Sequence, residues 1–220
     1  MFLGHWGVGF GAKSVAPRVS LGTAFLAAQW VDLLWPTLLV AGLETVRVEP
    51  GATRVTPLDF VHYPYTHSLV AGIFWAALLG GIHYLGRRSL RAASVIGFAV
   101  VSHWFLDFVV HAPDLPLVPG GGPHVGLGLW ESLPATAAVE AAVLGAGLAL
   151  YLRATEPRDR AGSFGLGALV AFLLVVYAAN VLGPPPPNAE SIAWIGHAQW
   201  LLVAAGYGVD RHRRPRETPA

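Results

Sequence analysis

The sequence contains no cysteine and few charged residues. Among its 220 residues there is no Cys, and Asp, Glu, Lys and Arg together make up 12%. The absence of cysteine excludes disulfides, thiolate metal sites and cysteine nucleophiles, so a bound metal must be held by His, Asp or Glu. A soluble domain usually has about 25% charged residues. With 54% hydrophobic residues, the composition instead indicates a membrane protein.

The chain also lacks a strong net charge. Its formal charge is +1 at pH 7, which gives no electrostatic footprint for nucleic acid, so no nucleic-acid partner is expected. The one basic cluster, RHRRPR at 211–216, is short and terminal. We interpret it as a topology anchor, with a nucleic-acid or lipid-headgroup patch as the alternative.

Long hydrophobic runs dominate the rest of the chain. Each is near the length of about 20 residues that spans a bilayer, and Pro- and Gly-rich loops separate them. Residues 2–16 are shorter and predict a helix packed against the first span. We therefore expect an all-α, polytopic membrane helix bundle in one domain, 1–209, with about six transmembrane helices plus this short N-terminal helix, followed by a basic cytoplasmic tail, 210–220. The six runs lie near 20–43, 66–86, 91–111, 133–152, 163–182 and 191–208.

The arginines predict the orientation of the bundle. They are concentrated in the loops at 86–91 and 153–162 and in the C-terminal segment, whereas the loops at 112–130 and 183–190 contain no Lys or Arg. Because cytoplasmic loops carry the excess of basic residues, we expect a multi-pass protein whose C-terminus is cytoplasmic. The lipid bilayer is then its first partner.

Residues 102–117, SHWFLDFVVHAPDLPL, carry polar groups in an apolar stretch. His103, Asp107 and His111 follow at four-residue steps, which place them on one face of a helix. Such groups are costly in a hydrophobic segment unless they are paired, metal-bound or facing a cavity. Two ligands one turn apart can chelate one ion. The alternatives are a buried His–Asp hydrogen bond or a proton relay. We expect His111, at the helix end, and Asp114 to support a ligand.

Other buried polar residues are predicted to lie at a similar depth. Counted from the basic ends of their helices at ~1.5 Å per residue, most of them lie roughly 18–24 Å into the membrane. His62 and His67, in HYPYTHS, are expected at the outer mouth, roughly 30 Å up. Neutral imidazole and carboxylate suit a hard or borderline divalent ion. The expected metal ligands are His5, Asp32, His62, His67, His103 and Asp107.

Glu140 and His197 fall in the same predicted layer. Glu140 is a candidate general base, together with Asp107 as a candidate catalytic carboxylate. His197 is a candidate partner that fixes the tautomer of a ligand histidine. For Glu140 and His197, a simple hydrogen bond between two helices explains the pattern equally well.

These motifs together resemble a known family. An N-terminal His, an Asp in the first span, the HYPYTHS step and the SHWFLD step occur in bacterial inner-membrane proteins called membrane-bound metal-dependent hydrolases. That family is thought to be distantly similar to zinc-dependent phospholipase C. The resemblance covers roughly residues 1–115. Where the family often has Pro-Asp-x-Asp, this chain has WVDLLWP, and Tyr63 replaces a common basic residue.

The resemblance implies a bacterial inner (cytoplasmic) membrane protein that binds a divalent metal, with Zn²⁺ as the expected ion. The expected activity is metal-dependent hydrolysis of a lipid or lipid-linked phosphoester from the outer leaflet side. Two other functions stay open. Aligned intramembrane His, Asp and Glu also describe a metal-ion or proton transporter or channel, and a structural membrane protein could use a buried polar layer to join its helices.

Overall fold

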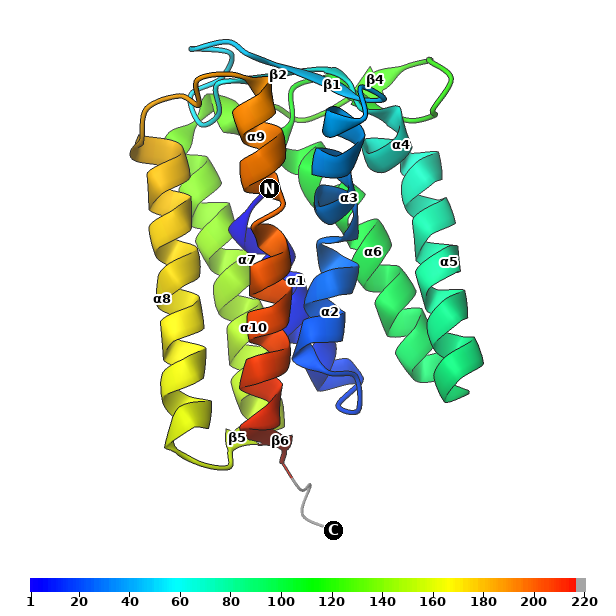
Figure 1. The fold of residues 1–220 in the computed structure, drawn as a ribbon, viewed down its shortest axis with the longest axis vertical. Coiled ribbons are helices and arrows are strands. Elements are labelled where there is room, and N and C mark those ends of the chain that lie inside the picture. The colour runs from blue at the N-terminus through cyan, green and yellow to red at the C-terminus, as the bar shows by residue number, and fades with distance from the viewer. Residues whose placement is uncertain (217–220) are drawn as a thin grey trace.

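The computed structural model describes residues 1–216 as a bundle of helices that run close to one long axis (Figure 1). Helices make up 67% of the chain, which confirms the all-α prediction. The helices are α1 (Leu3–Val15), α2 (Leu21–Ala28), α3 (Trp30–Val40), α4 (Pro64–His67), α5 (Leu69–Arg87), α6 (Leu90–Val110), the 3-10 helix η1 (Leu129–Glu131), α7 (Leu133–Ala154), α8 (Arg160–Leu182), α9 (Ala189–Gly196) and α10 (Gln199–Arg211).

Polar residues in the loops set where the long helices begin. Ser68, Ser89, Ser132 and Asp159 stand directly before α5, α6, α7 and α8. Each side chain accepts a hydrogen bond from the backbone N–H three residues later. These N–H groups have no partner within the helix, so the cap satisfies them at its start.

Four helices are long and apolar enough to cross a membrane, namely α5, α6, α7 and α8. The pair α2 and α3 makes a fifth candidate, although it bends by 56°. The described residues thus contain four or five candidate spans, and the predicted count of six is not confirmed. The expected run at 191–208 is divided at His197 into α9, with 8 residues, and α10, with 13, which are stacked in Figure 1.

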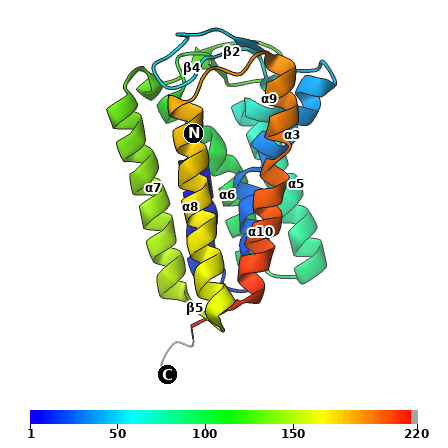
Figure 2. The same cartoon turned by 60° about the vertical axis from the view of Figure 1, so that its left-hand side comes forward.

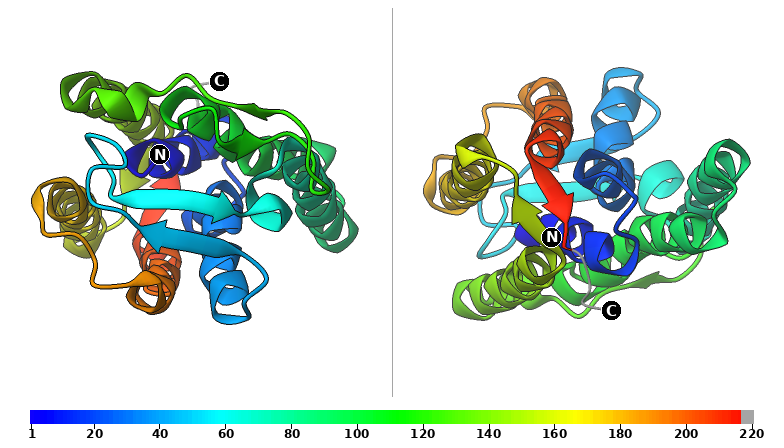
Figure 3. Two further views of the ribbon diagram at one scale, coloured as in Figure 1. Left: turned by 90° about the horizontal axis from the view of Figure 1, so that it is seen from above. Right: turned by 90° about the horizontal axis from the view of Figure 1, so that it is seen from below.

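Helix α1 lies inside the bundle, as the view from above shows (Figure 3). Leu3, Trp6 and Phe10 are almost fully buried, and α1 packs along α7, α2 and α6. Its approach to α7 requires glycine, because a Cβ atom on Gly147 would lie 1.9 Å from the carbonyl oxygen of Gly7. Close backbone packing of this kind is typical of membrane helices, and it fixes the position of α1.

Short strand pairs close the two ends of the bundle (Figures 1 and 3). At one end, which we call the hairpin end, β1 (Thr45–Val48) pairs with β2 (Leu58–His62), and β3 (Leu115–Pro116) pairs with β4 (His124–Val125). At the other, β5 (Thr155–Pro157) pairs with β6 (Arg213–Pro215). We call this the basic end.

The segment expected to be a tail, 210–220, is therefore partly folded. Helix α10 extends to Arg211, and β6 follows it. The Arg213 side chain holds the strand in place by donating hydrogen bonds to Thr155 and to the carbonyl oxygen of Gly162. Residues 217–220 of the expected tail lie outside the described residues.

Candidate metal centre

Five side chains capable of binding a metal meet between the helices. They form two overlapping groups, and within each group one ligand atom from every residue lies within 4.8 Å of the others. The two groups share His103, so they make a single cluster. It contains His5 from α1, Asp32 from α3, His67 from α4, and His103 and Asp107 from α6. The structure thus brings together five of the six residues that the sequence predicted as ligands.

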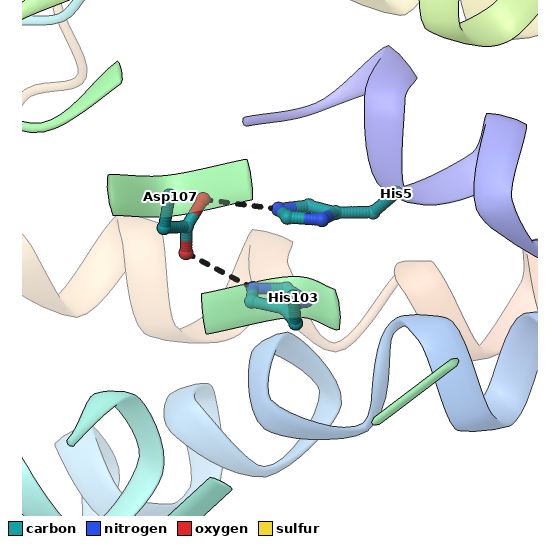
Figure 4. Close-up of side chains that lie close together, drawn as sticks. All are labelled: His5, His103 and Asp107. Atoms are coloured by element: carbon teal, nitrogen blue, oxygen red, sulfur yellow. Dashed lines mark hydrogen bonds and ion pairs between the residues drawn. The ribbon is translucent and has the colours of Figure 1, made fainter. Parts of the chain in front are cut away.

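Within each of the two groups, the separations match those of donors around a small ion. His5 Nε2 lies 3.1 Å from Asp107 Oδ1, and His103 Nε2 lies 3.2 Å from Asp107 Oδ2 (Figure 4). Asp32 Oδ1 is 3.3 Å from His67 Nε2 and 3.6 Å from His103 Nε2. An ion bound tetrahedrally at about 2.0–2.1 Å holds neighbouring donors about 3.3 Å apart. Each group therefore offers three donors that fit a tetrahedral divalent ion.

The carbonyl oxygen at the end of α2 orients His103, because the first apolar run is broken there. Helix α2 ends at Ala28, and α3 starts at Trp30 in a new direction. His103 Nδ1 lies 2.9 Å from the Ala28 carbonyl oxygen, which can only accept, so this nitrogen is the donor. In the neutral ring, Nε2 then has a free lone pair. Nε2 is buried without a hydrogen bond and faces Asp32 and Asp107, as a metal ligand would.

A second chain of hydrogen bonds orients His67. The Thr66 hydroxyl donates to Glu44 Oε2 at 2.7 Å and accepts from His67 Nδ1 at 2.6 Å. Glu44 also accepts the backbone N–H groups of Tyr65 and Thr66, which keeps its carboxylate in place. His67 Nε2 is therefore left free to face Asp32. Partners of this kind fix the tautomer of histidines that bind metals.

Asp107 joins the two halves of the cluster. Its Oδ1 faces His5, and its Oδ2 faces both His103 and, at 3.8 Å, His67. The amino group of Met1 contacts the same Oδ1. Two carboxylates, Asp32 and Asp107, thus share a buried space. The Met1 amino group already faces Asp107, and the remaining charge of the pair could be balanced by a protonated histidine or by a divalent cation.

Glu140 holds the element that carries His5. Its Oε1 accepts the backbone N–H of Phe2 at 2.9 Å, and its Oε2 accepts that of Gly4 at 2.8 Å. The carboxylate therefore caps the start of α1. His5, one residue further on, stacks on His103 with ring centroids 3.5 Å apart and planes within 8°. This arrangement favours a positioning role for Glu140. Its role as general base stays a prediction.

Two of the predicted residues, His62 and His197, make no contact with the cluster. His62 is exposed at the end of β2, where its ring contacts Tyr65. His197 lies at the break between α9 and α10, and its two ring nitrogens are 3.1 Å from the Thr37 hydroxyl and 2.7 Å from the Ala193 carbonyl oxygen. Neither shares a group with the five residues above. His197 therefore does not fix the tautomer of a ligand histidine.

His111 and Asp114 lie beside the cluster, on the side of the hairpin end. His111 Nδ1 is 3.0 Å from Asp114 Oδ1, and the Tyr63 hydroxyl donates to the same oxygen at 3.1 Å. The Tyr63 ring centroid lies 5.3 Å from that of His67. Burial and the nearby Asp114 raise the pKa of Tyr63, so its phenol stays protonated. His111, Asp114 and Tyr63 thus form a hydrogen-bonded group beside His67.

Sequence reasoning missed Glu44, Thr66 and the Ala28 carbonyl as parts of the site. Thr66 carried a signal, because it directly precedes His67 in YTHS. Glu44 stood in a loop with other charges, and its burial to 2% exposure was not foreseeable from its neighbours. Ala28 contributes through its backbone, for which the sequence offers no pattern.

Comparisons of the chain with family models, curated proteins and solved structures find no match. The geometry of the cluster is therefore what a proposal of function has to rest on.

Proposed function

We propose that this chain is a membrane-embedded, zinc-dependent hydrolase that acts on a lipid or lipid-linked phosphoester. One observation carries the proposal. Asp32, His67 and His103 direct three ligand atoms at one another, Asp107 lies beside His103, and separate hydrogen bonds leave Nε2 of both histidines free. A layer that only joined helices would not require both imidazoles to be fixed in the same tautomer.

Zinc suits this set of donors. Imidazole nitrogen and carboxylate oxygen are its usual ligands in the absence of thiolate. The ion would also offset negative charge of Asp32 and Asp107, which lowers the cost of placing these carboxylates in an apolar bundle.

The bound ion would supply Lewis-acid activation of water and of a phosphoryl oxygen. The two carboxylates of the cluster differ in access. The Asp32 side chain is 24% exposed, whereas that of Asp107 is 2% exposed. We assign the entrance for water and substrate to the Asp32 side, and Asp32 Oδ2 as the proton acceptor. Asp107, which faces three histidines, holds the ligands in place.

The substrate class follows from where the cluster lies. Its residues come from the start of α1, from α3 and α4, and from the second half of α6, toward the hairpin end of the bundle (Figure 1). If the basic end faces the cytoplasm, as the distribution of arginine predicts, the cluster is nearer the outer leaflet of a bacterial inner membrane. Lipids and lipid-linked phosphoesters reach such a depth, unlike soluble substrates.

The first experiment measures metal content by mass spectrometry on protein purified in detergent without chelator. We expect one or two zinc ions per chain in the wild type and none in His103→Ala/Asp107→Ala. His62→Ala, at an exposed histidine outside the cluster, is the control and should keep its metal. A folded wild type without stoichiometric metal would refute the proposal.

Hydrolysis is tested separately on the metal-loaded protein. We expect release of the headgroup from a fluorescent phospholipid, with Asp32→Asn abolishing turnover but retaining part of the metal. Full metal occupancy without turnover of phospholipid or of a lipid-linked diphosphate would refute the hydrolase and leave the metal site standing.

A specific feature favours transport as the second candidate. Two apolar runs are broken near the cluster, at Gln29 between α2 and α3 and at His197 between α9 and α10. Gln199 links the two, because its Nε2 donates to the backbone oxygen of Asp32 at 3.5 Å. Broken helices mark ion sites in many transporters. Zinc entry into dye-loaded proteoliposomes, lost in Asp32→Asn, would favour this function over hydrolysis.

A further inference from the structure

Helices α7 and α8 both reach the basic end of the bundle, near β5 (Figure 2). A groove lies between them at this end, lined by residues that are not part of the metal centre. Its volume is 450 Å³, within the range of ligand pockets. The walls are mostly apolar: Leu148 and Leu152 come from α7, and Leu166 and Val170 from α8. Helix α8 is only 17% buried, so the groove opens toward the lipid that surrounds the spans.

Two arginines line the same groove where it reaches the end of the bundle. Arg213 is 5% exposed, and its guanidinium group donates to the Thr155 hydroxyl and to the carbonyl oxygens of Thr155 and Gly162. Arg216 donates to the Thr155 carbonyl oxygen as well, at 3.2 Å. Two positive charges therefore lie close together, and a nearby anion would offset their repulsion.

Within the described residues, neither arginine contacts a carboxylate. The acidic residues of this end within the described part of the chain already have partners at 2.8 Å: Glu156 pairs with Arg214, Asp159 with His212, and Asp210 with Lys13. The Arg213 guanidinium lies 5.3 Å from the centroid of the Tyr151 ring, which stabilises the cation but does not neutralise it. In the part of the chain that the structure describes, the positive charge of the groove is therefore available to an anionic ligand.

We propose that this groove binds an anionic phospholipid, with its phosphate between Arg213 and Arg216 and an acyl chain against the leucines of α7 and α8. A guanidinium group suits a phosphate, and that of Arg216, which donates to Thr155 only through Nε, can donate two hydrogen bonds to it. Both arginines lie at the ends of the spans, at the level of lipid headgroups, where basic pockets between helices select anionic lipids. The apolar walls distinguish this site from one for free phosphate.

The test is a lipid titration of delipidated full-length protein, followed by native mass spectrometry. Phosphatidylglycerol and phosphatidylcholine with the same acyl chains serve as the two probes. We expect the wild type to prefer phosphatidylglycerol, and Arg216→Gln to reduce that preference about fivefold. Arg211→Gln changes an exposed arginine on α10 that does not line the groove, and should leave the preference unchanged.

A second variant tests the acyl part of the site without altering its charge. Gly167 lines the groove, and a Cβ atom there would meet nothing within 4 Å. Gly167→Leu should fill the groove without disturbing the fold, and it should weaken the binding of both lipids. Gly145→Leu, at an equally open glycine of α7 outside the groove, is the control.

The proposal is overturned if Arg216→Gln leaves the lipid preference unchanged, or if Gly167→Leu binds phosphatidylglycerol as the wild type does. Inorganic phosphate should not displace the lipid at millimolar concentration, and displacement would mean that the acyl chain contributes nothing. Thermal unfolding of each variant confirms that the fold is intact. Arg213 is left unchanged, because its side chain also holds β6 against β5.

Discussion

Replacement of Thr66 by valine tests how the orientation of His67 affects metal binding, without removing any of the candidate ligands. Valine keeps the shape of threonine but removes the hydroxyl that joins His67 to Glu44. The His67 ring would then lose the bond that leaves its Nε2 free for metal. Loss of such a supporting bond typically weakens metal binding by about 10- to 100-fold, or roughly 1.4 to 2.7 kcal/mol. Binding should persist, because Asp32, His103 and Asp107 are unchanged.

The same substitution also removes one of the hydrogen bonds of Glu44. Its Oε1 still accepts the backbone N–H groups of Tyr65 and Thr66, but Oε2 loses the hydroxyl. A buried acceptor without its partner costs about 1–3 kcal/mol. We therefore expect the metal-free protein to unfold at a lower temperature, in addition to its weaker metal binding. The two effects are measured independently.

The assay is a zinc competition with a chromogenic chelator in detergent micelles, at a temperature where the variant is folded. Thr66→Ser should restore most of the affinity, because it restores the hydroxyl. Thr37→Val is the matched control, since the Thr37 hydroxyl bonds to His197 outside the cluster. If folded Thr66→Val binds zinc as tightly as Thr37→Val does, the reasoning about the orientation of His67 is refuted.

Three further outcomes follow from the packing and the charges. Gly147→Ala should lower the free energy of unfolding by about 1–3 kcal/mol, because its Cβ would clash with α1. Gly145→Ala, whose Cβ would have no atom within 4 Å, should leave the stability unchanged. Equal stability of the two variants in a denaturant titration would contradict this prediction. Glu140→Gln should lower the thermal midpoint by weakening the cap of α1, and unchanged stability with lost turnover would instead support the general-base prediction. The hydrogen bond with His212 holds the pKa of Asp159 below its ordinary value of 3.8. The ionised Asp159 therefore stabilises the fold above that pH, and the stabilisation is lost as the pH falls through the lower pKa of the folded state. Thermal scans from pH 5 to pH 2 should show a weaker acid dependence for Asp159→Asn than for the wild type.

The sequence determined the helical character of the chain and part of the candidate site. Apolar runs of about 20 residues need helices in a membrane, because only the helix satisfies its backbone without water. The four-residue step from His103 to Asp107 follows from helix geometry alone, and their side chains lie 3.2 Å apart. The count from the helix ends also placed His5 and Asp32 near that depth. These properties depend on local spacing, which the sequence contains directly.

Only the tertiary structure decided which residues complete the cluster. His62 and His67 looked alike in sequence, yet the turn into α4 buries His67 and leaves His62 exposed. The break after Ala28 and the burial of Glu44 supply the bonds that orient His103 and His67. These bonds join residues that lie far apart in the chain, such as Ala28 and His103. Periodicity describes one element at a time, whereas the orientation of a ligand depends on what another element places beside it.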